Sequence, residues 1–177
     1  MAKRNMADAE RAAGIIHRIR AMTGQRALTQ TSITLESVIE DVMFLFGPEF
    51  KRKGVVPTLD LMAPAPQVMA DRIQLQQVFA NMVMNALQAM TSEGQRRLVI
   101  RTSLLNPEHV NAEVEDSGPG IPIQHLPRLF ESFFTTKEEG VGIGLALCRS
   151  IIESHGGRIE AMNLPDGRGA RFHFYYP

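Results

Sequence analysis

The sequence predicts an α/β protein of the α+β kind, with helices layered on one face of a mixed, mostly antiparallel sheet. Segments with apolar residues at helical spacing are interleaved with short alternating or β-branched segments. Two pairs of these extended segments are joined by short turns, which indicates antiparallel neighbours. The chain has 177 residues, enough for one domain with a core and a short appendage.

Composition excludes several classes of partner. Lys plus Arg and Asp plus Glu number 19 each, so no net positive charge attracts nucleic acid or an anionic membrane. The basic cluster Lys51–Lys53 is interpreted as a solvated helix end. Cys148 is the only cysteine, which excludes an intrachain disulfide and a cysteine metal cluster. No run of about 18 apolar residues predicts a membrane span, and no apolar signal core stands at the N-terminus. We therefore expect a cytoplasmic domain, or a piece cut from a longer protein, without nucleic-acid or membrane contact.

The first predicted helix spans residues 8–22, where apolar side chains recur at helical spacing. It has nothing before it to pack against, so it lies on the main domain or pairs with another chain. His17 falls on this helix and is interpreted as a surface histidine. Residues 29–34 are polar and β-branched, and they predict a linker or a short strand.

An amphipathic helix is predicted for residues 35–53, with Gly54 as its stop. Pro48 falls inside it and is expected to kink or restart it. Residues 55–62 predict a strand, for which Pro57 favours an edge position. Residues 67–70 predict a short extended piece.

The strongest helix signal follows Asp71, a good N-cap, and continues to Met90 with a broad apolar band. Residues 98–104 and 109–115 predict two strands of an antiparallel hairpin. The region between Gly118 and Val141 is long for a loop, with a short helix at 126–130, and long loops often carry function. A helix at 142–154 and two strands at 158–162 and 170–176 complete the chain.

Asp116 ends the strand of the hairpin and is followed by Gly118 and Gly120. Glycine lets a ligand approach the backbone closely. An ionised carboxylate only accepts hydrogen bonds, and the exocyclic amine of adenine donates where O6 of guanine does not. Asp116 therefore favours adenine, although an ordinary turn aspartate is the alternative interpretation.

Three further glycines, Gly140, Gly142 and Gly144, run into the helix at 142–154. Bare backbone amides at a helix start bind phosphate. Lys137, just before them, either places a positive charge on terminal phosphates or is a solvated loop lysine. Asp116 could bind the edge of a nucleobase and the glycine segment could bind phosphates, and together they indicate a nucleotide site.

Asn81 and Asn85 are one turn apart in the buried helix and share a face. Two carboxamides in an apolar helix are costly unless they find partners. A structural network would satisfy them. Beside a nucleotide site, a carboxamide oxygen also suits Mg²⁺, which keeps several waters and bridges phosphates.

The joint order of these motifs resembles the catalytic ATP-binding domain of two-component sensor histidine kinases, within the superfamily of gyrase, heat-shock chaperone and mismatch-repair ATPases. The resemblance covers about residues 35–177. The motifs are Gln77–Ala86 (N box), Asp116–Gly120 (first glycine box), Phe130–Lys137 (F box) and Gly140–Leu145 (second glycine box).

The resemblance implies a two-layer sandwich, with three helices on one face of the sheet and a lid over ATP at 130–140. The Phe-Phe-Thr-Thr-Lys run resembles the nitrogen-regulator and oxygen-sensor branch. Asn81 and Lys137 are the expected catalytic residues, and Asn85 the Mg²⁺ ligand. The expected nucleotide-binding set is Asn85, Asp116, Gly118, Gly120, Ile121, Thr136, Lys137, Gly140, Gly142, Gly144 and Leu145.

The chain departs from the family at Ala170, where Thr or Ser often aids adenine binding through water, so weaker nucleotide binding is expected. Residues 1–28 resemble the C-terminal part of the second dimerisation-hairpin helix, and residues 29–177 the catalytic domain. His17 is followed by Arg18 rather than an acid, so it is not assigned as phosphoacceptor. We expect a truncated chain that binds ATP without phosphorylating itself. Its expected partners are a histidine hairpin, a response regulator reached through it, and a second copy bound through residues 8–25.

Two alternatives remain. A self-contained ATPase clamp of the chaperone or mismatch-repair kind places a glutamate four residues before the metal-binding asparagine, but that position is Asn81, which is no general base. An inactive pseudokinase would keep only the fold. Intact glycines, Asn85 and Asp116 argue against it, and Ala170 leaves it open.

Overall fold

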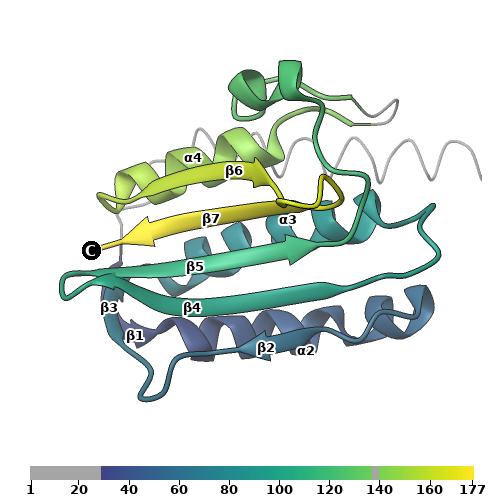
Figure 1. Ribbon diagram of the computed structural model, residues 1–177. Coiled ribbons are helices and arrows are strands. Elements are labelled where there is room, and N and C mark those ends of the chain that lie inside the picture. Colours follow the sequence, from purple (N-terminus) through teal and green to yellow (C-terminus); the bar gives the residue numbers. More distant parts are fainter. Residues whose placement is uncertain (1–28, 137–139) are drawn as a thin grey trace, which may run out of the picture.

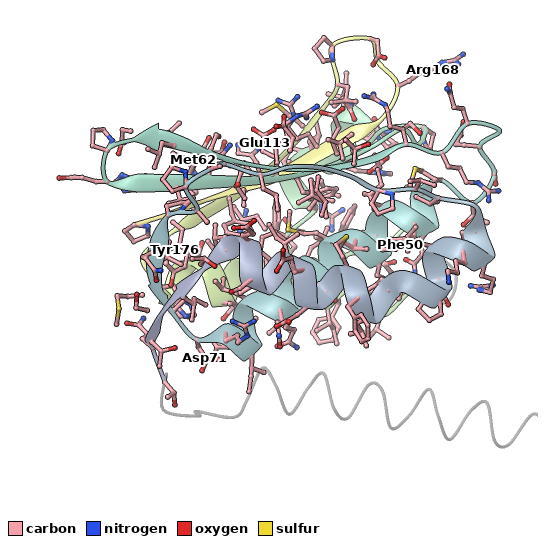
Figure 2. All side chains as sticks on the ribbon, turned by 90° about the horizontal axis from the view of Figure 1, so that it is seen from below. Phe50, Met62, Asp71, Glu113, Arg168 and Tyr176 are labelled. Atoms are coloured by element: carbon pink, nitrogen blue, oxygen red, sulfur yellow. The ribbon has the colours of Figure 1, made fainter. Side chains whose placement is uncertain are left out.

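The computed structural model describes residues 29–136 and 140–177, which form two layers (Figure 1). One layer is a five-stranded sheet in the order β2-β4-β5-β7-β6. The other consists of helices α2, α3 and α4, and Figure 2 shows α2 and α3 on one side of the sheet, with side chains filling the space between. This confirms the predicted two-layer fold with three helices on one face. The expected helix at 8–22, its His17, and Lys137 lie outside the described residues.

The sheet is mixed but mostly antiparallel, as predicted. Strand β2 (Thr58–Asp60) runs parallel to β4 (Leu98–Asn106), whereas β4–β5, β5–β7 and β7–β6 are antiparallel. The other strands are β5 (His109–Asp116), β6 (Arg158–Asn163) and β7 (Ala170–Tyr176).

Strand β2 lies at the sheet edge, as Pro57 predicted, but it is shorter than the expected 55–62. The Val55 N–H donates to the Phe50 carbonyl at 2.9 Å, so the first of these residues completes the end of a helix. Within the expected strand, only the three residues Thr58–Asp60 pair with β4.

A second, two-stranded antiparallel sheet joins β1 (Thr31–Thr34) to β3 (Gln67–Ala70). Of the residues 29–34, expected as a linker or a short strand, Thr31–Thr34 form a strand. This small sheet leads directly into the starts of two helices, because Thr34 caps α2 and Asp71 caps α3.

Helix α2 (Leu35–Lys53) has the predicted bounds, and Gly54 ends it with φ +62°. The helix continues through Pro48 without restarting. Pro48 is exposed, so water can hydrate the carbonyl that the missing N–H leaves unpaired.

Helix α3 (Arg72–Ala89) begins where predicted, since the Asp71 carboxylate accepts from the backbone N–H groups of Ile73 (3.0 Å) and Gln74 (3.2 Å). It is the central helix and packs on both α2 and α4. Its apolar band lies on the core, where the Phe79 ring meets Phe174 of β7 at 5.3 Å in an edge-on contact.

Two predicted helices shift. Helix α4 (Gly144–Ser154) starts two residues later than expected, because Gly142 has φ +69°, which a right-handed helix excludes. The short helix expected at 126–130 is instead a 3₁₀ helix, η1 (Ile123–Arg128). It begins directly after Pro122, whose carbonyl accepts from the His125 N–H at 2.8 Å. No helix of the described residues is long and apolar enough to cross a membrane.

Candidate nucleotide-binding site

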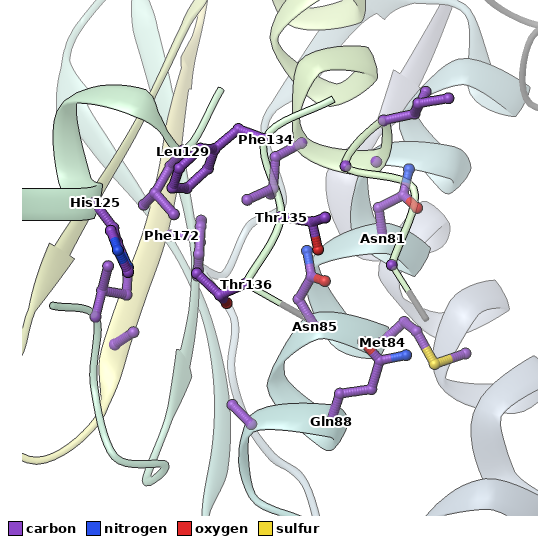
Figure 3. Close-up of a pocket in the computed structure, with 18 of the residues that line it drawn as sticks. Asn81, Met84, Asn85, Gln88, His125, Leu129, Phe134, Thr135, Thr136 and Phe172 are labelled. Carbon is purple, nitrogen blue, oxygen red and sulfur yellow. The ribbon is translucent and has the colours of Figure 1, made fainter. Parts of the chain in front are cut away.

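A cavity of about 460 Å³ lies at one end of the sheet (Figure 3). Its walls are α3, the loop after β5, η1, the segment ending at Thr136 and the start of α4. The cavity brings together predicted residues from four separate motifs: Asn81, Asn85, Asp116, Gly120, Ile121, Thr136, Gly140, Gly142, Gly144 and Leu145. Gly118 is not among the lining residues.

Asp116 is the last residue of β5 and is 3 % exposed. Burial raises its pKa from the usual 3.8 to about 6, although hydrogen bonds from the backbone of Gly118 and Ala170 oppose the shift; the negative charge of Glu115 adds to it. At pH 7 the ionised form still exceeds the neutral form by about tenfold. Asp116 therefore offers the cavity a buried carboxylate that accepts hydrogen bonds.

Gly118 supports this carboxylate from behind. Its N–H donates to Asp116 Oδ1 at 2.8 Å. A Cβ at this position would lie 2.8 Å from the same oxygen and 3.0 Å from the Cβ of Ala89 on α3. The glycine thus lets the loop pass between Asp116 and α3, although it does not line the cavity.

Gly142 brings two stretches of backbone into contact at the wall of the cavity. A Cβ on Gly142 would lie 2.5 Å from the carbonyl carbon of Phe133 and 2.6 Å from the carbonyl oxygen of Phe134. The Phe133 N–H donates to the Gly142 carbonyl at 2.8 Å. The second glycine motif and the F-box segment therefore form one wall, which only glycine permits at this position.

Asn81 and Asn85 project from α3 into the cavity, where Figure 3 shows Thr135 and Thr136 on the facing segment. A Cβ on Gly144 would lie 3.4 Å from Asn81 Oδ1, so this carboxamide lies next to the N-terminus of α4. Carboxamides, hydroxyls and helix N–H groups are all neutral, and such groups hold phosphate without a buried charge of their own.

The donor set also decides how a metal could bind. The described residues hold no group of three or more His, Cys, Asp or Glu side chains suited to a metal. The Asn85 oxygen is a hard neutral ligand that fits Mg²⁺, which usually takes one or two protein ligands plus phosphates and water. The residues therefore fit a metal that arrives with a phosphate ligand.

The sequence analysis missed several lining residues. Met84 and Gln88 follow Asn81 and Asn85 on the same face of α3, so their spacing of three and four residues was a usable signal. His125 gave no signal, because it reaches the cavity through the fold of the loop, where its ring lies 5.5 Å from Phe134. Phe134, within the F box, also lines the cavity, with the Arg128 guanidinium 4.7 Å above its ring.

A two-layer fold with one cavity, lined by a buried carboxylate and by glycine-rich backbone at a helix start, defines a nucleotide-binding domain. Residues 70–177 match the family of histidine kinase-, DNA gyrase B- and HSP90-like ATPases, and the chain belongs to this family. Within it, the chain is the ATP-binding catalytic domain of a sensor histidine kinase, as its relatives show.

The sensor protein FixL of Bradyrhizobium diazoefficiens is 38 % identical over 167 residues, covering 94 % of this chain and 33 % of FixL. The sensor histidine kinase TmoS of Ectopseudomonas mendocina is 34 % identical over 173 residues, covering 96 % of this chain and 18 % of TmoS. The chain thus spans a third or less of these two curated relatives.

Solved structures agree. The catalytic domain of the histidine kinase ThkA superposes with a TM-score of 0.75 at 33 % identity, covering 84 % of this chain and 95 % of that one. Full-length ShkA in complex with AMPPNP superposes with a TM-score of 0.80 at 25 % identity, covering 100 % of this chain and 39 % of ShkA. ThkA in complex with the response regulator protein TrrA superposes with a TM-score of 0.81 at 29 % identity, covering 97 % of this chain and 48 % of ThkA. These relatives do not favour the ATPase clamp or the pseudokinase.

Proposed function

We propose that this domain binds ATP with Mg²⁺ and transfers the γ-phosphoryl group to a histidine on a dimerisation hairpin. One observation carries the proposal: a single cavity is lined by Asp116, by Asn81 and Asn85, and by the glycines of residues 140–144. Gly144 lies beside Asn81, whereas Gly118, which binds Asp116, lies beside Ala89, and these two positions of α3 are about two helical turns apart. This separates a site for the base from a site for phosphates.

At the base end, the Asp116 carboxylate would accept a hydrogen bond from the adenine amine. Gly120 and Ile121 would form the wall against the ring, and Ala170 fills the place where family members often carry a hydroxyl. The Gly118 N–H donates to Asp116 Oδ1 and holds the carboxylate in place. The other oxygen, Oδ2, would then accept the hydrogen bond from adenine.

At the phosphate end, the N–H groups near Gly142 and Gly144 and the side chains of Asn81 and Thr136 would hold phosphate oxygens. Asn85 would contribute a ligand to Mg²⁺, which when bound neutralises phosphate charge during phosphoryl transfer. Lys137 is expected to add a positive charge there, and it lies outside the described residues.

The cavity suits transfer to a supplied acceptor better than hydrolysis. Among its described lining residues Asp116 is the only carboxylate, and it stands at the base end, away from the expected terminal phosphate. Asn81 occupies the place of the water-activating glutamate of ATPase clamps, and a carboxamide cannot take a proton from water.

The acceptor and the further partners belong to this proposal. The relatives include sensor proteins of which this chain spans a third or less, and one structural neighbour, ThkA, is bound to a response regulator. These names support a histidine hairpin and a response regulator as proposed partners. The proposal also keeps a dimer contact in residues 8–25, a domain boundary near residue 28 and a cytoplasmic location. His17 is not proposed as the acceptor.

Calorimetric titration with AMPPNP tests the proposal, with and without Mg²⁺, on the wild type and on Asn85→Ala. We expect micromolar binding by the wild type that Mg²⁺ strengthens, and an N85A variant that keeps the Mg²⁺-free affinity but loses the gain. Asn106→Ala, at the distant β4–β5 turn, is the matched control and should behave as wild type.

Absence of nucleotide binding in the wild type would reject the proposal. A metal effect that survives in N85A would reject the role of Asn85. Transfer of the γ-phosphoryl group to a separately supplied histidine hairpin then tests the kinase reaction, and radiolabel on His17 would contradict the exclusion of that residue as acceptor.

A further inference from the structure

Asn163, the last residue of β6, makes an unusual pair of hydrogen bonds. Its Oδ1 accepts from the Ile121 N–H at 2.6 Å, and its Nδ2 donates to the Ile121 carbonyl at 2.7 Å. One carboxamide thus satisfies both backbone groups of a single residue, as a neighbouring strand would. The pair fixes which end of the carboxamide is oxygen, because only one orientation matches a donor and an acceptor.

The position of Asn163 in the sheet explains why it reaches this loop. It pairs with Ala170 of β7, and Ala170 pairs in turn with Asp116 of β5, so the three residues form one row across three strands. Paired residues in antiparallel strands direct their side chains to the same face. Asn163 and the buried carboxylate therefore both face the helix layer, at the end of the sheet that holds the cavity.

The loop that follows β5 packs closely against Asn163 and against the turn between β6 and β7. Gly120 has φ +80°, and a Cβ there would lie 3.0 Å from Asn163 Oδ1. Gly169 has φ +96°, and a Cβ there would lie 2.2 Å from the carbonyl oxygen of Asp116. The loop after β5 is therefore pressed against the β6–β7 turn, with Asn163 as its attachment at Ile121.

A second attachment lies at the other end of this loop. The Ser117 N–H donates to the Arg97 carbonyl at 3.0 Å, and Ser117 Oγ accepts from the Arg97 N–H at 2.8 Å. Between the two attachments lie Gly118, Pro119 and Gly120, of which two are glycines with much backbone freedom. The two hydrogen bonds of Asn163 to Ile121 restrain the far end of this stretch.

We propose that Asn163 is a positioning residue for the base end of the nucleotide site: by binding both backbone groups of Ile121, it holds Gly120 and Ile121 at the spacing from Asp116 that an adenine ring requires. The inference rests on the proposed function. Asn163 does not line the cavity, whereas Gly120, Ile121 and Asp116 do, so it acts through them.

The test measures ADP affinity by calorimetry in Asn163→Ala. A loop that must be ordered on binding reduces affinity, and we expect the dissociation constant to rise at least tenfold. Asn111→Ala is the matched control: it also removes a side-chain amide of the same sheet, one that is 6 % exposed and bonds Glu113 and Ser103, but on the opposite face. N111A should lower stability and leave ADP affinity within twofold of wild type.

A second variant separates positioning from general stability. In Asn163→Asp, an ionised carboxylate accepts from the Ile121 N–H but cannot donate to its carbonyl, whereas the protonated acid does both. The ADP affinity of N163D relative to wild type should therefore recover as the pH falls from 8 to 5, while the same ratio for N163A stays constant. The wild-type series corrects for Asp116, which titrates in this range.

Wild-type ADP affinity in N163A, or an equal loss in N111A, would overturn the inference while leaving the proposed function intact. If N163A does not fold, N163D decides alone, and a relative affinity that does not change with pH would overturn the inference. Absence of ADP binding by the wild type would instead reject the proposed function.

Discussion

Replacing Asp116 with asparagine should stabilise the nucleotide-free domain and at the same time weaken nucleotide binding. Burial raises the pKa of this carboxyl from 3.8 to about 6, so the folded chain binds the proton more tightly than the unfolded chain. The contribution to stability is complete below about pH 4 and is lost as the pH rises through 6. At about 1.4 kcal/mol for each tenfold change in proton binding, the buried charge costs about 3 kcal/mol at neutral pH.

Asparagine has nearly the same shape and carries no charge, so most of this cost should disappear. Its oxygen can keep the hydrogen bond from the Gly118 N–H, and its NH₂ group then takes the place of the second carboxylate oxygen. A donor would face the adenine amine, which is also a donor. We expect ADP affinity to fall at least about 30-fold, which corresponds to about 2 kcal/mol.

Urea unfolding of the nucleotide-free protein at pH 7.5, 6 and 4.5 measures the first effect, and calorimetry at pH 7.5 the second. D116N should exceed the wild type in stability by about 1–3 kcal/mol at pH 7.5, with the difference shrinking toward pH 4.5. Asp60→Asn is the control, because its side chain is 72 % exposed. A less stable D116N at neutral pH, or a difference independent of pH, would refute the assignment of Asp116 as a destabilising buried charge.

Two further predictions concern the walls of the site and the open face of the sheet. Gly142→Ala should abolish ADP binding or unfold the domain, because the new Cβ meets backbone at 2.5 Å; Gly167→Ala shares the positive φ but has open space, and a thermal melt should show a loss of only about 1 kcal/mol. Glu115→Gln should cost about 1–2 kcal/mol in urea unfolding at pH 7, since Glu115 Oε2 binds Arg101 at 2.9 Å and Arg171 at 3.1 Å. Burial alone would raise the pKa of Glu115, but the two arginines lower it below its usual value. The stability that this ion pairing adds is therefore present above about pH 4.5 and is lost in acid. The difference in stability between wild type and E115Q should vanish at low pH, because the carboxylate is then protonated.

The order of elements and most candidate residues that line the cavity were readable from the sequence because both depend on local patterns. The broad apolar band after Asp71 predicted α3 nearly to the residue, since capping and helical periodicity are properties of adjacent residues. Asp116 and the spaced glycines of residues 140–144 were also found, because backbone freedom and acceptor chemistry belong to the residue type itself.

The tertiary structure decided which of these residues meet and what supports them. Gly118 belongs to the expected nucleotide-binding set, and the structure packs it between Asp116 and Ala89, outside the residues that line the cavity. The start of α4 depended on the left-handed backbone of Gly142, which packs against the backbone of Phe133 and Phe134. Asn163 gave no signal, since its bonds to Ile121 join residues 42 positions apart in the chain. Strand register brings Asn163, Ala170 and Asp116 into one row, and register is set by the pairing of whole strands rather than by any local pattern.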